Sequence, residues 1–214
     1  MSVELVVVGA GGFGRETLDV VEAINAASPV AAFDVLGVVD ASPSALNLAR
    51  LAERRIPWLG TFDELSRLAR STQFLIGVGS PQARERIAAE MTQLGFTAAT
   101  AIHPAAQVGS ASSIDAGSVI CAGAQVSTNV TLGKHVHVNP NATIGHDTIL
   151  ESFVSINPGA IVSGDVVVEE RALVGAGAVV LQGLRVGSDS LVGASACVVR
   201  DVPRACTVKG VPAK

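Results

Sequence analysis

A six-residue repeat is the sequence feature that most constrains the fold of this chain. From residue 102 to residue 198, every sixth position carries an aliphatic side chain, with no insertion and no slip. A helix repeats every 3.6 residues and a simple strand every two, so neither explains a period of six. Hexapeptide periodicity is typical of a parallel β-helix, in which each repeat supplies one flat face and a bend. The series consists of Ile102, Val108, Ile114, Ile120, Val126, Leu132, Val138, Ile144, Leu150, Ile156, Val162, Val168, Val174, Val180, Val186, Val192 and Val198.

The position two residues before each aliphatic is also restricted. From Ala106 to Ala196 it holds Ala, Ser, Thr or Val, except for Leu184. We expect both series to point inward and to stack on their equivalents in neighbouring coils. Gly or Asn often follows the aliphatic directly, which predicts a bend at that point. With three faces per coil, the repeats fill roughly five to six coils.

Composition excludes several classes of function. The net charge is −4 and the chain has no basic run, so it lacks the signature of a nucleic-acid-binding protein. Although 49% of the residues are hydrophobic, no uninterrupted apolar run approaches the ~20 residues of a membrane-spanning helix. The first fourteen residues lack a basic segment and are expected to form a strand and loop rather than a signal peptide. Cys121, Cys197 and Cys206 are an odd set without metal-ligand spacing, which favours reduced thiols in a cytoplasmic protein.

A glycine-rich turn stands near the start of the chain. The predicted strand Glu4–Val8 is followed by Gly-x-Gly-x-x-Gly over residues 9–14 and by a helical pattern from Arg15 to about Ala27. Glycines at such a strand-to-helix turn allow a phosphate to approach the helix N-terminus. A second strand, Val35–Val39, ends at Asp40, where a carboxylate could meet a ribose or a base.

The size of this first region limits its ligand. Its other predicted elements are a helix Thr61–Ser71, a strand Gln73–Val78, a helix Pro81–Leu94 and a last strand Phe96–Ile102. About 100 residues make only half of a doubly wound dinucleotide fold. One nucleotide-sized ligand, such as a nucleotide-sugar diphosphate, is therefore favoured over NAD(P), and a purely structural glycine turn is the remaining alternative. The chain is thus predicted to contain a small Rossmann-like α/β domain, residues 1–100, followed by a parallel β-helix domain, residues 101–214, with His103 as a junction residue.

Within the repeats, His146 is the strongest candidate for a catalytic base. It lies two positions after Ile144, so it should point outward near a bend, and Asp147 follows it directly. A neighbouring carboxylate can orient an imidazole or support its positive charge. The residue eighteen positions further on is Gly164, which should lie one strand spacing, about 4.8 Å, from His146. Its N–H could hold a developing oxyanion, and the alternative is a solvated bend histidine.

The other polar residues of the repeats give weaker signals. His137 should stack under Ser155 and line a cleft or the surface, whereas His135 is expected to be exposed. Asn139 and Asn157, eighteen apart, predict an asparagine ladder that supports a bend, and Asn139 could also touch substrate. The histidines have different offsets in their repeats, so we expect no metal site. Without a serine or cysteine nucleophile in a triad, a base at this bend indicates direct transfer in a ternary complex.

Several of these motifs together resemble a known family. They are residues 8–16 (VGAGGFGRE), 144–147 (IGHD), 157–160 (NPGA), 163–164 (SG) and the tail 209–214 (KGVPAK). In this combination, across essentially the whole chain, the sequence resembles the bacterial sugar acetyltransferases of the sialic-acid O-acetyltransferase (NeuD) type. That family includes nucleotide-amino-sugar N-acetyltransferases.

The resemblance implies a specific architecture and set of roles. Such proteins are homotrimers of left-handed β-helices with active sites between subunits, and acetyl-CoA lies along the C-terminal coils. By resemblance, His146 would be the general base, Asp147 would orient it, and the Gly164 N–H would bind the thioester oxygen. Two departures are apparent: many relatives have histidine at the position of Ser155, a contact that His137 could partly replace, and Asp147 is often Glu.

The remaining roles also follow from the resemblance. Gly11, Gly12 and Asp40 would meet the nucleotide, and the tail residues Gly210, Pro212 and Ala213 would border CoA. The implied function is acetyl-CoA-dependent N-acetylation of a nucleotide-linked amino sugar. Alternatives are O-acetylation of sialic acid or a related sugar, another acyl-CoA donor, or a non-catalytic hexapeptide protein like γ-class carbonic anhydrase scaffolds that have lost their metal.

Overall fold

The structure is a computed structural model that describes residues 2–214, with the backbone alone at position 66. The chain divides into two compact units, and the boundary lies between Ala101 and Ile102. Each unit has its own architecture, and each is described separately below.

The first unit is an α/β domain built on a parallel sheet with the strand order β2-β1-β3-β4. Within the described residues, no helix has the length and apolar character needed to cross a membrane. The elements are β1 (Val3–Val8), α1 (Gly12–Ala26), β2 (Phe33–Val39), α2 (Ala45–Glu53), the 3-10 helix η1 (Phe62–Arg67), β3 (Gln73–Ile76), α3 (Pro81–Gln93) and β4 (Thr97–Ala98).

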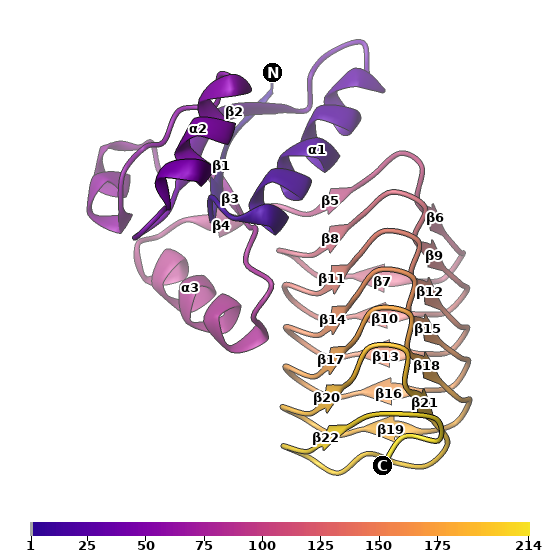
Figure 1. Ribbon diagram of the computed structural model, residues 1–214. Coiled ribbons are helices and arrows are strands. Elements are labelled where there is room, and N and C mark those ends of the chain that lie inside the picture. The colour runs from indigo at the N-terminus through magenta and orange to yellow at the C-terminus, as the bar shows by residue number, and fades with distance from the viewer. Residues whose placement is uncertain (1) are drawn as a thin grey trace. The chain divides into compact units, whose positions relative to one another are not determined.

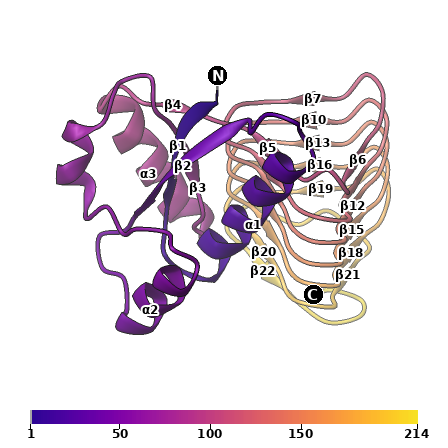
Figure 2. The same cartoon turned by 90° about the horizontal axis from the view of Figure 1, so that it is seen from above.

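Two helices cover one face of this sheet. Leu18 of α1 and Leu51 of α2 pack in one buried cluster with Val7 and Val38 of the sheet. Figure 2 shows α3 on the opposite face from α1. The strand order reverses between β1 and β3, because β2 adds on one side of β1 and β3 on the other. Ligands of open α/β sheets bind at the carboxyl ends of the strands at such a reversal.

Two sequence predictions for this unit are wrong in detail, and one helix was not predicted. The helix predicted over Thr61–Ser71 is only the short η1, which begins at a capping box in which the Glu64 side chain accepts from the Thr61 N–H. Helix α2 was not predicted, although Ser44 caps it by accepting a hydrogen bond from the Asn47 N–H. The strand predicted over Phe96–Ile102 is two separate strands. β4 belongs to the sheet of this unit, and β5 belongs to the seven-stranded sheet of the second unit.

The second unit is a left-handed parallel β-helix of two-residue strands, drawn as stacked coils in Figure 1. In the described chain, its strands form parallel sheets of five, seven and six members, which Figure 2 shows as the sides of a prism. The strands are β5 (Ala101–Ile102), β6 (Gln107–Val108), β7 (Ser113–Ile114), β8 (Val119–Ile120), β9 (Gln125–Val126), β10 (Thr131–Leu132), β11 (His137–Val138), β12 (Thr143–Ile144), β13 (Ile149–Leu150), β14 (Ser155–Ile156), β15 (Ile161–Val162), β16 (Val167–Val168), β17 (Leu173–Val174), β18 (Val179–Val180), β19 (Arg185–Val186), β20 (Leu191–Val192), β21 (Cys197–Val198) and β22 (Thr207–Val208).

The aliphatic series forms the core of this prism, as the six-residue period predicts. From Ile120 to Val198 its members are buried, together with the small residues two positions earlier. The first members depart from the prediction: Ile102 is 36% and Val108 is 40% exposed. They belong to the first coil, which has no preceding coil to cover it.

The bends are not located where the sequence predicted them. Residues with positive φ lie three positions after the aliphatic rather than one, as at Asn129, Asp147 and Asp165, each with φ of 59°. A glycine directly after the aliphatic is required for packing rather than for a bend. A Cβ at Gly145, for example, would lie 2.4 Å from the Gly164 nitrogen of the next coil. Such glycines permit close approach of two backbones.

Truncation of one inward side chain tests the core. Ile156 is completely buried, whereas Ile161 points outward and is 43% exposed. Ile156→Ala should lower the free energy of unfolding by about 2–5 kcal/mol, because it removes buried methyl groups and leaves a cavity. Ile161→Ala should cost clearly less. Urea unfolding followed by circular dichroism measures both, and equal losses in the two variants would contradict the inward assignment.

Candidate active site

His146 and Asp147 form a pair at one edge of the prism. We call this the His146 edge, defined as the bends that lead from the six-stranded sheet to the five-stranded sheet. Nδ1 of His146 lies 2.6 Å from Oδ2 of Asp147, and the two side chains are 63% and 48% exposed. The ionised carboxylate accepts a hydrogen bond, which favours the tautomer that carries its proton on Nδ1. Nε2 then has its lone pair directed away from the pair, as a general base requires.

Gly164 lies against the imidazole ring of His146, as predicted from the interval of eighteen residues between them. A Cβ at this position would be 2.7 Å from both Cε1 and Nε2 of His146, so any side chain would displace the ring. The Asp165 N–H donates to the His146 carbonyl at 2.8 Å, which fixes the two coils together at this point. No described residue accepts a hydrogen bond from the Gly164 N–H.

A third residue, Asn129, completes the hydrogen bonds of Asp147. Its Nδ2 lies 2.5 Å from the other carboxylate oxygen, Oδ1, of Asp147. Two hydrogen bonds lower the pKa of Asp147, because both favour the ionised form. The bond from Asn129 has the larger effect and the bond from His146 the smaller. The sequence analysis missed Asn129, although its position eighteen residues before Asp147 was a usable signal.

The other two histidines of the repeats lie elsewhere on the prism. His137 pairs in register with Ser155 on the seven-stranded sheet, as predicted, and both residues are buried, so a surface position for His137 is excluded. The expectation of an exposed His135 is wrong: the residue is buried and its ring stacks on Phe153, with centroids 5.3 Å apart. Phe153 is eighteen residues later, so the same register that places Gly164 over His146 covers His135.

Asn139 and Asn157 form the predicted ladder. Nδ2 of Asn139 donates to the Ile156 carbonyl at 3.0 Å and lies 3.5 Å from Oδ1 of Asn157. Both stand at the bends that lead from the seven-stranded to the six-stranded sheet, whereas His146 occupies a different edge. A single chain therefore does not bring Asn139 to His146, and substrate contact by Asn139 stays a prediction.

The glycines of the first unit separate into two groups. A Cβ at Gly14 would lie 1.8 Å from the Gly9 carbonyl oxygen, and one at Gly77 would lie 2.3 Å from the Gly14 Cα. These glycines therefore allow α1 to contact the ends of β1 and β3. A Cβ at Gly11 or Gly12 would meet nothing within 4 Å, so the N-terminus of α1 opens onto free space. Such a helix end can accept a phosphate.

Asp40 is placed beside this turn, but both of its oxygens are engaged. Oδ2 accepts from the Ala10 N–H at 2.8 Å and Oδ1 from the Ser42 N–H at 2.9 Å. The carboxylate thus ties the glycine-rich loop to the end of β2. A cavity of about 200 Å³ lies next to it at the carboxyl ends of β1, β2 and β3, lined by Val8, Gly9, Asp40, Ala41, Phe62, Val78 and Ile87.

Arg84 of α3 is a charged residue near the same strand ends that the sequence did not single out. Its side chain is buried and donates to the Val78 carbonyl at 3.0 Å. Burial lowers the pKa of Arg84 to about 9, because desolvation disfavours the charged form. The guanidinium holds the loop that follows β3.

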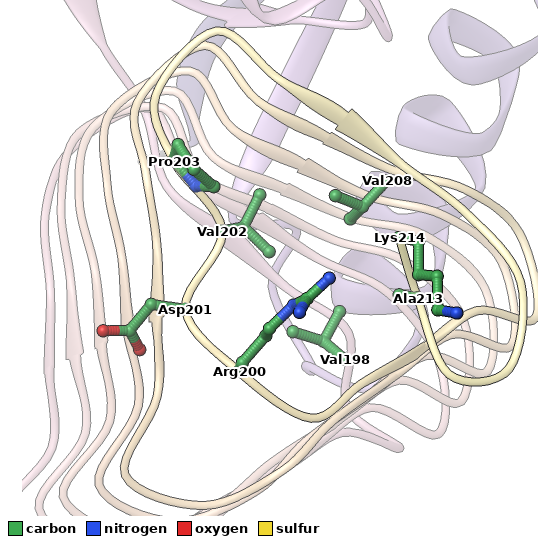
Figure 3. Close-up of a pocket in the computed structure, with 8 residues that line it drawn as sticks. All are labelled: Val198, Arg200, Asp201, Val202, Pro203, Val208, Ala213 and Lys214. Carbon is green, nitrogen blue, oxygen red and sulfur yellow. The ribbon is translucent and has the colours of Figure 1, made fainter.

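The tail closes the last coil of the prism. The Ala213 N–H donates to the Cys197 carbonyl at 2.8 Å, and the Gly210 carbonyl accepts from the Cys197 N–H at 3.0 Å, while Pro212 is exposed. Beside it is a cavity of about 230 Å³, lined by Val198, Arg200, Asp201, Val202, Pro203, Val208, Ala213 and Lys214. Figure 3 shows Arg200 directed across the end of the coil and Asp201 directed away from it.

In the part of the chain that the structure describes, no group of three or more His, Cys, Asp or Glu residues is arranged to hold a metal ion.

Comparison with known proteins decides the family. The family described as the PglD N-terminal domain matches residues 4–91. The acetyltransferase domain of PglB from Neisseria gonorrhoeae FA1090 is 32% identical, with a TM-score of 0.86 over 100% of this chain and 99% of that domain. The chain belongs to the hexapeptide-repeat sugar acetyltransferases. A search of curated proteins found no match.

Two other solved structures have the same architecture. PerB from Caulobacter crescentus, solved in complex with CoA and GDP-perosamine, is 29% identical with a TM-score of 0.86, and the match covers 99% of this chain and 96% of PerB. WeeI from Acinetobacter baumannii AYE is 25% identical with a TM-score of 0.84, covering 98% of each chain. The resemblance inferred from the sequence is confirmed, and with it the prediction of a sugar acetyltransferase that uses acetyl-CoA as co-substrate.

Two glycine substitutions test which glycines of this sugar acetyltransferase are required for packing. Gly14→Ala should lower the thermal midpoint by several degrees, because its Cβ would overlap the Gly9 carbonyl. Gly11→Ala should leave the midpoint nearly unchanged, because free space surrounds that position. Differential scanning fluorimetry compares the two. A stable Gly14→Ala protein would contradict the close contact between α1 and β1.

Proposed function

We propose that the protein transfers an acetyl group from acetyl-CoA to the amine of a nucleotide-linked amino sugar, with His146 as general base. The observation that carries this proposal is the exposed His146–Asp147 pair with Gly164 against its ring. The complex of PerB with CoA and GDP-perosamine supports an amino-sugar acceptor joined to a nucleotide.

The proposed step is a direct acyl transfer. The sugar amine attacks the thioester carbonyl, so that a C–N bond forms and the C–S bond breaks. Nε2 of His146 takes the proton from the amine, and the imidazolium so formed gives a proton to the sulfur of CoA as it leaves. The negative charge of Asp147 stabilises the imidazolium that exists between these events.

Gly164 has two roles in this proposal. Its lack of a side chain leaves space for the imidazole, because a Cβ would lie 2.7 Å from Nε2. Its N–H has no hydrogen-bond acceptor among the described residues and is the proposed donor to the oxygen of the tetrahedral intermediate. A backbone donor of this kind contributes about 10²–10³-fold to the rate in other acyl transfers.

The exposure of the pair supports a site completed by a second chain. Positioning of two substrates requires walls that exclude water, whereas the His146 side chain is 63% exposed on a single chain. We therefore place the reaction between subunits of a homotrimer, with acetyl-CoA along the C-terminal coils near Gly210, Pro212 and Ala213. Asn139 lies at another edge of the prism, so it would contact a substrate held at the His146 edge of a neighbouring subunit. His137 and Ser155 are buried, so they would support the substrate site from beneath the surface rather than touch the ligand.

The first unit would hold the nucleotide. Gly11 and Gly12 leave the N-terminus of α1 open for a diphosphate. The cavity at the strand ends would take the nucleoside, with Asp40 at its margin. Because both oxygens of Asp40 already accept backbone hydrogen bonds, its main contribution would be to hold the loop in shape.

Replacement of the proposed base tests the mechanism. His146→Ala should lower kcat by at least about a hundredfold, the range expected for loss of a general base. Gly164→Ala should also lower kcat, because its methyl group displaces the ring. His103→Ala is the control and should retain kcat within about threefold. Steady-state assays with acetyl-CoA measure these values, and near-wild-type turnover by His146→Ala would remove His146 from this role.

A thermal-shift screen identifies the substrate class. UDP-, GDP-, CDP- and dTDP-linked amino sugars are compared with free sialic acid, because a ligand that binds only the folded state raises the midpoint. At least one nucleotide-linked amino sugar should raise the midpoint more than sialic acid does. A shift with sialic acid alone would instead favour O-acetylation of the free sugar.

A further inference from the structure

The His146 edge carries a three-residue chain of hydrogen bonds rather than a pair. Asn129 and Asp147 occupy the same bend position in successive coils, and each has φ of 59°. Nδ2 of Asn129 is 2.5 Å from Oδ1 of Asp147, and Oδ2 of Asp147 is 2.6 Å from Nδ1 of His146. Each carboxylate oxygen thus has its own partner.

The chemistry of the groups sets the direction of these bonds. A carboxylate can only accept, so the amide of Asn129 must present its NH₂ group to Asp147. With Oδ1 occupied, the plane of the carboxylate is fixed and Oδ2 is directed at the imidazole. A neutral His146 then donates from Nδ1 and has its lone pair on Nε2.

We propose that Asn129 is a positioning residue for acetyl transfer, which holds the Asp147 carboxylate so that His146 keeps its proton on Nδ1. This inference rests on the proposed function, because it assigns Nε2 of His146 as the base. It adds a donor from the preceding coil to a site otherwise made of His146, Asp147 and Gly164. The titratable groups along this edge near Asn129 are His146, Asp147 and, one coil further on, Asp165.

The backbone at Asn129 does not depend on its side chain. The Asn129 N–H donates to the Ser110 carbonyl at 2.9 Å, and the adjacent Thr128 carbonyl accepts from the Asp147 N–H at 3.2 Å. Glycine adopts positive φ without strain, so Asn129→Gly removes the donor and leaves the bend intact. Asn141 offers a matched control, because it has φ of 58° at the equivalent bend of another edge and its N–H donates to the Ala122 carbonyl.

Kinetics of three variants of the full-length protein test the positioning role. Asn129→Gly should lower kcat at least about fivefold, a part of the effect of a general base, and KM for both substrates should change less than about twofold. Asn141→Gly should retain wild-type kcat. Asn129→Asp puts an acceptor where a donor stood, so at pH 8 it should lose more activity than Asn129→Gly. As the pH falls, the new carboxyl takes up a proton and donates to Asp147, so this difference should narrow.

A second readout needs no substrate. In ¹⁵N-histidine NMR, wild-type His146 should show a protonated Nδ1, and Asn129→Gly should shift the population towards the Nε2-protonated tautomer. Wild-type kcat in Asn129→Gly, or identical pH profiles for the two Asn129 variants, would overturn the inference. If His146→Ala is inactive while Asn129→Gly is unaffected in both readouts, only the inference fails. If the wild type acetylates no sugar yet the tautomer shifts, the proposed function fails and only the effect of Asn129 on the His146 tautomer stands.

Discussion

Backbone hydrogen bonds between successive coils are the interaction on which this molecule depends. Up to β21 they join each strand to the strand eighteen residues later, as in the pairing of Thr143 with Ile161 and of Ile144 with Val162, and in the shorter last coil β20 pairs with β22 sixteen residues later. Each position along the chain therefore has a neighbour one strand spacing away. The same register that stacks aliphatic side chains in the core also aligns side chains at the edges. It places Gly164 over the ring of His146 and produces the stacked pair of His135 and Phe153.

This register explains how a scaffold with so few long elements can hold a reactive group. A two-residue strand has almost no independent stability, but every strand between the first and the last of its sheet is paired on both sides by parallel neighbours. The bends at Asn129 and Asp147 are fixed by the coils that flank them, so their side chains start from defined positions. The first unit depends instead on close packing of its backbone. Glycines at the reversal of strand order allow helix α1 to contact the ends of β1 and β3.

Much of this was predictable from the sequence, because a strict period of six allows few architectures. The period predicted the core and, through the interval of eighteen, the neighbours His137–Ser155 and His146–Gly164. It could not predict the conformation of the bends, since side chains three positions after the aliphatic vary from Ala111 to Asp165 and only the backbone is shared. Burial of His135 was missed although the interval of eighteen places Phe153 over it. The hydrogen bonds of Asp40 were also missed, because they depend on neighbours that no periodicity specifies.

In the proposed reaction, Nε2 of His146 is held by Asp147 at the edge of the prism and receives the proton of the attacking group. The most direct measurement is a crystal structure of the protein with CoA and a nucleotide-linked amino sugar bound together. The acceptor nitrogen should lie within about 2.6–3.2 Å of Nε2, the range for proton transfer to a general base. An acceptor bound at another edge, with the His146 ring facing solvent and no ligand near it, would contradict the account.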